Sequence, residues 1–251
     1  MTDVADRVRS RIETADPATV WTPIDFLDVG TRDAVDKSLQ RLARAGVLRR
    51  IDRGLYDRPA SSALTRAPRA PDYREVLDAL ARRDQARMLI DGLTAANDLG
   101  LTTAVPARVV VHTDMRRRSI PLGNLTIEFK LTAPSKLYWA GRPAMRVVQA
   151  LHWLKDILAS DTGTILSPLA VILEDPVRGV AIREDLRVGL RTLPAWMQNV
   201  VRRMLDGAVD AAMAPPPAWN LAKETAPRRR GGVSRSGGRR ASRLRGSGGR
   251  R

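Results

Sequence analysis

Residues 31–59 have the sequence TRDAVDKSLQRLARAGVLRRIDRGLYDRP, and this stretch decides the fold expected for the N-terminal part. Val35, Leu39 and Leu42 recur at i, i+4 and i+7, which places them on one face of a helix. Thr31 directly precedes this pattern and belongs to the residue types that cap helix N-termini. The spacing therefore predicts an amphipathic helix that begins after Thr31.

A glycine and a basic hairpin follow the predicted helix. Gly46 is the residue type that most readily takes the left-handed conformation at a helix end. The segment from Val47 to Tyr56 predicts a β-hairpin, with its turn around residues 52–54 and Gly54 at a position that needs a positive φ. We expect Tyr56 to pack in the core. Helix, glycine and hairpin together are typical of the second half of a winged helix-turn-helix.

The residues upstream complete that module. Val4, Val8 and Ile12 predict a first helix, which ends before Pro17. Residues 20–21 are expected to form a short strand, and residues 22–27 a short helix with Thr22 as N-cap and a proline at its first position. The expected order is helix, strand, helix, turn, helix and hairpin. In such modules the last helix lies in the major groove of DNA.

Polar and cationic residues lie on the predicted helix and hairpin where they are able to meet DNA. Side chains near the start of such a helix reach base edges, and cationic side chains pair with phosphates. The alternative is a solvated helix with no ligand, which charged faces commonly are. The strand alternation does not decide which hairpin arginine faces DNA. The candidate DNA-binding residues are Thr31, Arg32, Asp36, Lys37, Gln40, Arg41, Arg44, Arg49, Arg50 and Arg53.

Two stretches of the chain resemble a known family. Residues 22–59, TPIDFLDVGTRDAVDKSLQRLARAGVLRRIDRGLYDRP, are similar to the N-terminal domain of AbiEi-type antitoxins of type IV toxin–antitoxin systems. Residues 99–130, which contain LGLTTAVPARVVVHTD and IPLGNLTIEFK, resemble the second domain of that family. The resemblance implies a protein that represses its own operon and neutralises a nucleotidyltransferase toxin encoded beside it.

The net charge of +16 is unevenly distributed along the 251 residues. Ten arginines and no acidic residue follow Pro227, so residues 1–227 carry only +6. A low-complexity segment of this composition does not bury a core. It is expected to be a disordered basic tail, and two roles stay open: a non-specific nucleic-acid arm, or an extension with no selected role. An arm would use Arg228, Arg229, Arg230, Arg239 and Arg240.

The predicted fold class is α+β, and the chain divides into four segments. Residues 1–59 form the winged helix-turn-helix, 60–72 a proline-containing linker, 73–213 a mainly helical domain with a small β-sheet, and 214–251 the tail. Within the third segment we expect helices over 73–82, 88–99 and 196–209, and one long helix over 145–158. Strict alternation over 125–131 predicts a strand, and 109–111 a buried one, with 119–120 as a partner in a hairpin.

Residues with recognisable catalytic or metal-binding spacing are scarce. Cysteine is absent, and His112 and His152 lie in no metal-ligand motif, so structural roles are favoured. Asp114, Glu128 and Lys130 follow a D…ExK pattern, in which carboxylates on adjacent strands hold a divalent metal in some nucleases. The alternative is that Glu128 and Lys130 form the solvent face of a strand. We expect no catalytic residue, metal or cofactor.

The sequence thus favours a non-enzymatic DNA-binding antitoxin and autorepressor, with operator DNA and a nucleotidyltransferase toxin as partners. Two alternatives stay open: a plain transcription regulator whose second domain senses an effector, and a metal-dependent nuclease. No apolar run approaches the length of about 18 residues that spans a bilayer. The absence of cysteine and of a signal peptide favours a cytoplasmic location, with no membrane partner.

Overall fold

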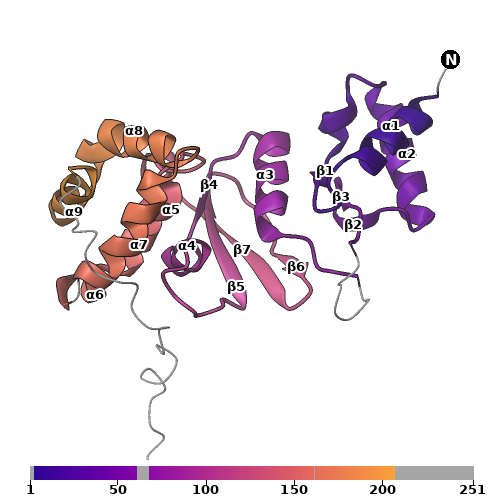
Figure 1. The fold of residues 1–251 in the computed structure, drawn as a ribbon. Helices are drawn as coiled ribbons and strands as arrows, with labels where there is room; N and C mark the ends of the chain where they lie inside the picture. Colours follow the sequence, from indigo (N-terminus) through magenta and orange to yellow (C-terminus); the bar gives the residue numbers. More distant parts are fainter. Residues whose placement is uncertain (1–2, 61–67, 161, 207–251) are drawn as a thin grey trace, which may run out of the picture.

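The computed structural model describes residues 3–60, 68–160 and 162–206. The described residues form an α+β structure with nine α-helices and two small sheets. Figure 1 shows an N-terminal unit at one end, a central sheet with α3 beside it, and the helices α5 to α9 at the other end. The segments predicted as tail, 214–251, and most of the predicted linker lie outside the described residues.

The N-terminal unit (residues 3–60) contains two α-helices, a 3₁₀ helix and three strands. The antiparallel strand order is β1-β3-β2. The predicted first helix, main helix and hairpin are all present, whereas the predicted helix after Thr22 is a single 3₁₀ segment. The elements are α1 (Val4–Thr14), β1 (Val20–Trp21), η1 (Pro23–Phe26), α2 (Arg32–Arg44), β2 (Arg49–Asp52) and β3 (Leu55–Asp57).

Two glycines set the ends of α2 and of the hairpin turn. Gly46 has φ +73° and Gly54 has φ +67°. This left-handed conformation is unfavourable for residues that carry a Cβ. After Gly46 the chain folds back, because the backbone N–H groups of Val47 and Leu48 both donate to the carbonyl of Leu42. Both glycine expectations are therefore confirmed.

The second sheet has four strands in the order β4-β5-β7-β6. Strands β5 and β7 are parallel neighbours, because the chain leaves β5, crosses to the edge strand β6 and returns through a hairpin into β7. The expected hairpin and the strand over 125–131 are confirmed. Only Ile127 of β7 is fully buried, and Leu131 is exposed, so the alternation is less clean in burial than in sequence. The strands are β4 (Met88–Ile90), β5 (Arg108–Thr113), β6 (Ile120–Leu122) and β7 (Leu125–Leu131).

The prediction of a single helix over 88–99 is wrong. Residues Met88–Ile90 form β4, an antiparallel neighbour of β5, and only Gly92–Asp98 form a helix, α4. Asp91 separates the two, because its carboxylate accepts from the backbone of Thr94 at 3.0 Å and of Val110 at 2.9 Å. The Asp91 side chain therefore caps α4 and also binds the backbone of β5. The apolar run was ambiguous between helix and strand, and pairing with β5 decided it.

The remaining helices are α3 (Tyr73–Asp84), α5 (Met145–Trp153), α6 (Lys155–Ser160), α7 (Thr162–Glu174), α8 (Gly179–Gly189) and α9 (Ala195–Leu205). The predicted long helix over 145–158 is interrupted at Leu154 and forms α5 and α6. The predicted last helix is present as α9, although residues beyond 206 lie outside the described part of the chain. Gly92 allows α4 to approach α5, since a Cβ there would lie 2.5 Å from the Cβ of Trp153.

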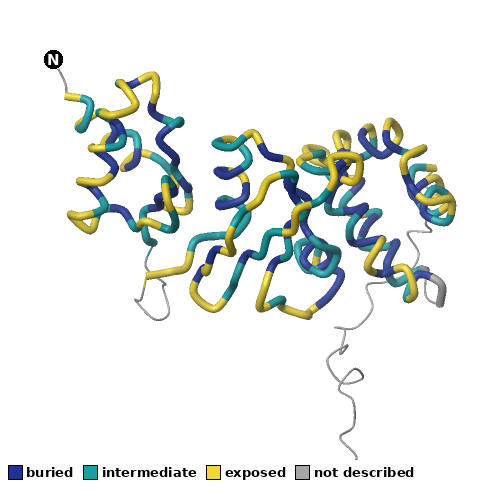
Figure 2. Tube along the Cα trace, turned by 180° about the vertical axis from the view of Figure 1, so that it is seen from behind, coloured by how far each residue is buried: buried dark blue, intermediate teal, exposed yellow. Residues whose placement is uncertain are grey.

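The N-terminal unit packs against the rest of the described chain. Val20 and Leu55, both fully buried, belong to the large core cluster that also contains Val76 and Leu80 of α3. The smaller cluster, which includes Val8, holds α1 and α2 together inside the unit. Figure 2 shows buried segments on both sides of this junction. The expected division near residue 60 is thus crossed by core contacts.

Candidate nucleic-acid interface

Helix α2 is fixed in the N-terminal unit by one buried face. Val35, Leu39, Leu42 and Ser38 are buried there, and the Ser38 hydroxyl donates to the carbonyl of Ala34 at 2.8 Å. At the helix start, the Thr31 hydroxyl oxygen accepts from the backbone N–H of Ala34 at 3.4 Å, as the sequence predicts. The helix is therefore packed into the core by one face, with its opposite face outward.

That outward surface, the α2 face, carries most of the candidate residues of the helix. Arg32 forms an i,i+4 ion pair with Asp36, with 3.0 Å between Nε and Oδ2. Lys37, Arg41 and Arg44 have no ion-pair or hydrogen-bond partner for their side chains among the described residues. Three cations are thus free to pair with phosphates. The exposed residues that define the α2 face are Arg32, Asp33, Lys37, Gln40, Arg41 and Arg44.

The two candidate arginines at the start of the hairpin have different environments. Arg49 is the cross-strand partner of Asp57 and binds its carboxylate through Nε at 3.0 Å and through Nη2. The Asp57 side chain is only 4% exposed, so Arg49 neutralises a buried charge. Arg50 is exposed and has only a long contact of 3.4 Å to the carbonyl of Asp52. The structure thus separates two residues that strand alternation left undecided.

The β2–β3 turn is attached to the second part of the chain, which comprises the described residues from 68 to 206. Arg53 is exposed, but its backbone carbonyl accepts from Nη1 of Arg83 at 2.7 Å. Asp52 lies 3.6 Å from Nη2 of Arg117, which also binds Asp84. Because the Arg117 side chain is only 13% exposed, burial lowers its pKa in spite of these carboxylates. The turn is therefore anchored rather than projecting freely.

The segment that holds these features also carries a family signature. A family model described as "Family of unknown function (DUF6088)" matches residues 7–164, which is more than half of the chain. The chain belongs to the DUF6088 family. The matched segment runs from within α1 into α7 and includes most of the N-terminal unit and the whole central sheet. A search of the curated proteins found no match.

The D…ExK residues of this DUF6088 protein are not brought together. Glu128 is the register partner of Val110, whereas Asp114 lies four residues further along the same chain direction, roughly 13 Å away. Asp114 accepts from the backbone N–H of Arg87 at 3.0 Å, and Glu128 binds Arg108 at 3.3 Å. Lys130 is exposed. The described residues contain no cluster of three or more His, Asp or Glu side chains able to hold a metal ion.

Both histidines lie in ordinary structural contacts. His112 is half-buried on β5, and its Nδ1 is 3.0 Å from the hydroxyl oxygen of Thr132. Burial and the nearby charge of Lys130 lower the pKa of His112. The ring of His152 meets Trp196 edge-on, with 6.1 Å between centroids. These contacts agree with the structural roles that the sequence favours.

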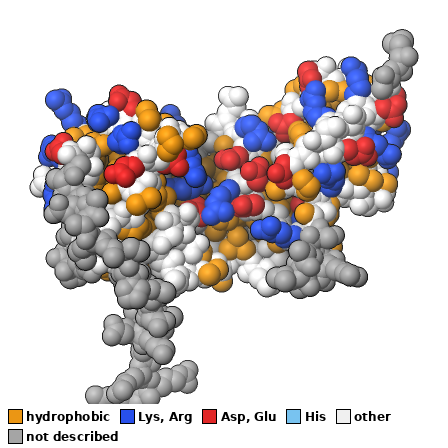
Figure 3. Space-filling model, in the orientation of Figure 1, with side chains coloured by type: hydrophobic (Ala, Val, Ile, Leu, Met, Phe, Trp, Pro, Cys, Tyr) orange, Lys and Arg blue, Asp and Glu red, His pale blue; other side chains and the backbone are white. Residues whose placement is uncertain are grey.

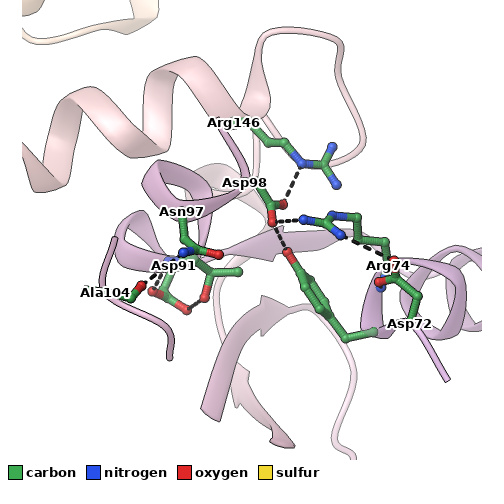
Figure 4. A network of polar contacts seen from close by, with 9 residues as sticks. Asp72, Arg74, Asp91, Asn97, Asp98, Ala104 and Arg146 are labelled. Atoms are coloured by element: carbon green, nitrogen blue, oxygen red, sulfur yellow. Dashed lines mark hydrogen bonds and ion pairs between the residues drawn. The ribbon is translucent and has the colours of Figure 1, made fainter. Parts of the chain in front are cut away.

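Sequence reasoning missed a polar network around Asp98 of α4 (Figure 4). The Asp98 side chain is only 2% exposed and accepts from the Tyr73 hydroxyl at 2.5 Å, from Arg74 and from Nε of Arg146 at 2.9 Å. Burial alone would raise the pKa of Asp98, but the three hydrogen bonds outweigh it and the pKa is lowered. Burial and Asp98 together raise the pKa of Tyr73.

No local signal announces this network. Arg74 is 24 residues and Arg146 is 48 residues from Asp98 in the sequence. Only the packing of α3, α4 and α5 brings them together. Arg74 lies on α3, Asp98 on α4 and Arg146 on α5, and no sequence motif links these residues.

The candidate tail residues Arg228, Arg229, Arg230, Arg239 and Arg240 lie outside the described residues. Among the helices of the described part, none has the length and apolar character needed to cross a membrane.

Proposed function

We propose that this protein is a DNA-binding antitoxin that represses its own operon through a winged helix-turn-helix formed by the N-terminal unit. The observation that carries the proposal is the α2 face, where Lys37, Arg41 and Arg44 are exposed and unpaired on a helix packed into the core by its opposite face. Cations without internal partners are available for phosphate contacts, and Gln40 is a side chain suited to a base edge.

The order of elements supports this assignment. The sequence α1, β1, η1, α2, β2 and β3 is the order of a helix-turn-helix followed by a hairpin wing. In that geometry α2 enters the major groove, and the exposed Arg50 lies on the hairpin beside it. Arg49 is left out of the proposed contact set, because its guanidinium is engaged by Asp57. Figure 3 shows basic side chains exposed on the N-terminal unit.

The antitoxin part of the proposal rests on the resemblance to AbiEi-type antitoxins. The toxin would be a nucleotidyltransferase encoded beside this gene, and neutralisation does not require that the two proteins touch. The second part of the chain would carry antitoxicity without catalysis. A plain regulator with an effector-sensing second domain is the second candidate, and it is favoured by the arginine-lined cavity beside α3.

Footprinting on the upstream region of the operon tests the DNA-binding part. We expect Arg32→Ala combined with Lys37→Ala to remove protection, because Arg32 lies at the helix start where a base contact contributes about 1–3 kcal/mol, and Lys37 is an unpaired cation that pairs with phosphate. Arg187→Ala is the matched control, since Arg187 is an exposed arginine on α8, far from the α2 face in sequence. Undiminished protection by the double variant would exclude α2 as the DNA-reading helix.

A further inference from the structure

Four arginines line one cavity in the second part of the chain. The cavity has a volume of about 270 Å³ and lies between α3, β4 and the start of α5. The only carboxylate in its lining is that of Asp78. The four side chains that define this arginine cleft are Arg74, Arg87, Arg142 and Arg146.

A second, larger hollow adjoins the arginine cleft. Its volume is about 820 Å³, and Arg74 and Arg146 line both cavities. Much of its remaining lining is apolar and comes from α5, α7, α8 and the residue after α4: Leu99, Val147, Val171, Ile172 and Ile182. A basic cleft therefore continues, past two shared arginines, into a mainly apolar groove that Asp98, Asp175 and Arg178 also line. Figure 3 shows basic and acidic side chains side by side around the hollow between α3 and the α5–α8 helices.

The shared arginines are held in position by the buried carboxylate of Asp98. That carboxylate binds Nη2 of Arg74 through one oxygen and Nε of Arg146 through the other. Figure 4 shows the outer end of the Arg146 guanidinium directed away from Asp98. Neither Nη atom of Arg146 has a hydrogen-bond partner among the described residues, so both remain available as a fork. A fork of this kind matches two oxygens of one phosphate.

The other two arginines keep free donors as well. Arg87 makes one long side-chain contact, 3.4 Å from Nη1 to the carbonyl of Pro134. Arg142 binds Asp185 through Nε and Nη2, and its guanidinium lies 4.5 Å from the centroid of the Tyr138 ring. A planar cation placed over an aromatic ring and fixed by a carboxylate loses little freedom when an anion arrives.

We infer that the arginine cleft and the adjoining groove together bind a nucleoside di- or triphosphate. The phosphates contact Arg146 and Arg87, Arg142 lies beside them with its guanidinium engaged by Asp185, and the nucleoside lies in the groove beyond Arg146. A lone phosphate fills only the basic end, whereas an uncharged apolar ligand leaves the Nη atoms of Arg146 and most donors of Arg87 without partners. The site lies in the second part of the chain and is independent of the proposed DNA contacts of α2.

Titration calorimetry of the full-length protein with ATP, GTP, CTP and UTP, without DNA, tests this inference. We expect at least one of them to bind, and to bind more tightly than pyrophosphate or the free nucleoside. Arg87→Ala should weaken binding at least about tenfold, because it removes a charge-assisted hydrogen bond. The Arg87 side chain forms no ion pair among the described residues, so Arg87→Ala leaves no carboxylate unpaired and should fold. Arg146→Ala should weaken binding further, and Arg187→Ala should leave it unchanged.

These experiments distinguish a nucleotide from a nucleic-acid backbone as the source of the phosphate. They also distinguish nucleotide binding from operator binding. Absence of binding by all four nucleotides, or equal binding by Arg87→Ala and the parent protein, would overturn the inference. The inference would also be overturned if an oligonucleotide lacking a terminal phosphate bound to the arginine cleft while no nucleoside triphosphate did. The anion bound there would then be a nucleic-acid backbone. Operator footprinting by Arg87→Ala should be normal, so failure of nucleotide binding and failure of DNA binding are distinguishable.

Discussion

Arg83 donates a hydrogen bond of 2.7 Å to the backbone carbonyl of Arg53, and this bond fixes the β2–β3 turn of the N-terminal unit to helix α3. A second contact, 3.4 Å long, joins the same guanidinium to the carbonyl of Gly54. The Arg83 side chain is only 16% exposed, although the Arg53 carbonyl that accepts the shorter bond lies at the surface. The hairpin proposed to lie beside DNA is therefore mechanically linked to the part of the chain proposed to act on the toxin.

Replacing Arg83 should loosen this junction. Arg83→Ala is expected to lower the free energy of unfolding by about 1.5–3 kcal/mol, the usual contribution of hydrogen bonds to a charged group. Amide hydrogen exchange of residues 52–55 should become faster. Arg82→Ala is the comparison variant: Arg82 also reaches the N-terminal unit, at Val20 and Asp25, but it is 48% exposed and its contacts are longer and away from the turn, so its effect on residues 52–55 should be smaller. Equal exchange in both variants would contradict the anchoring role.

The pair Arg49–Asp57 should matter for stability rather than for DNA affinity. Arg49→Ala leaves the carboxylate of Asp57 buried without its partner, and we expect a loss of about 3 kcal/mol, near the lower end for a broken buried pair because Arg49 is 31% exposed. Arg49→Met with Asp57→Leu should recover part of that loss, because no unpaired charge remains. Urea unfolding of both variants and the parent measures it. A selective loss of operator affinity in Arg49→Ala, at normal stability, would instead place Arg49 at the DNA.

Patterns within a short stretch of sequence predicted the local elements well. The stripe of Val35, Leu39 and Leu42 is the buried face of α2, and Gly46 and Gly54 have the positive φ values expected of them. These features are local, because helix periodicity, capping and turn geometry depend on residues a few positions apart. The α2 face follows from the same periodicity, since the side opposite an apolar stripe is exposed.

Long-range pairing accounts for what the sequence did not predict. Met88–Ile90 is a strand because β5 is beside it, and an apolar run of this length gives no local sign of that. The Asp98 network joins residues from three helices, and the distinction between Arg49 and Arg50 depends on Asp57 across the sheet. Tertiary packing decides each of these, and short-range spacing carries no information about it.

The stability of the fold should depend on pH through His112. Burial, with help from Lys130, holds the folded pKa of His112 below its ordinary value of 6.5. The unfolded chain therefore binds the proton first, and the free energy of unfolding should fall as the pH drops below about 6.5. His112→Gln should show a flatter dependence between pH 7 and 5 in urea unfolding. An unchanged slope in this variant would mean that His112 titrates normally in the folded protein.

The basic segment after Pro227 should contribute affinity for DNA but no sequence preference. Its arginines would meet phosphates, which carry no base information. Truncation after residue 227 should flatten the dependence of log K on log salt concentration by about 0.9 for each phosphate that the segment neutralises. Binding isotherms at several salt concentrations, with operator and with unrelated DNA, measure this. Equal salt slopes for the full-length and truncated proteins would exclude a DNA role for the segment.

Repression and toxin neutralisation should be separable by point substitutions in the intact chain. Cutting the protein near residue 60 is a poor test, because Val20 and Leu55 lie in the core shared with α3 and the cut would expose them. Lys37→Ala with Arg41→Ala removes two unpaired surface cations and should leave folding intact while derepressing an operon reporter. The same variant should still rescue cells from the proposed nucleotidyltransferase toxin, if residues 68–206 carry antitoxicity.

Glu128→Ala belongs in the same assay, because it addresses the nuclease alternative. Glu128 pairs with Arg108 on the sheet surface, where Glu128 is 38% and Arg108 64% exposed, so its removal should change stability by less than about 1 kcal/mol. Rescue and repression by Glu128→Ala should both equal those of the parent protein. Loss of rescue in the Lys37/Arg41 variant would show that antitoxicity needs DNA binding. Magnesium-dependent DNA cleavage that disappears in Glu128→Ala would establish the nuclease in place of the antitoxin.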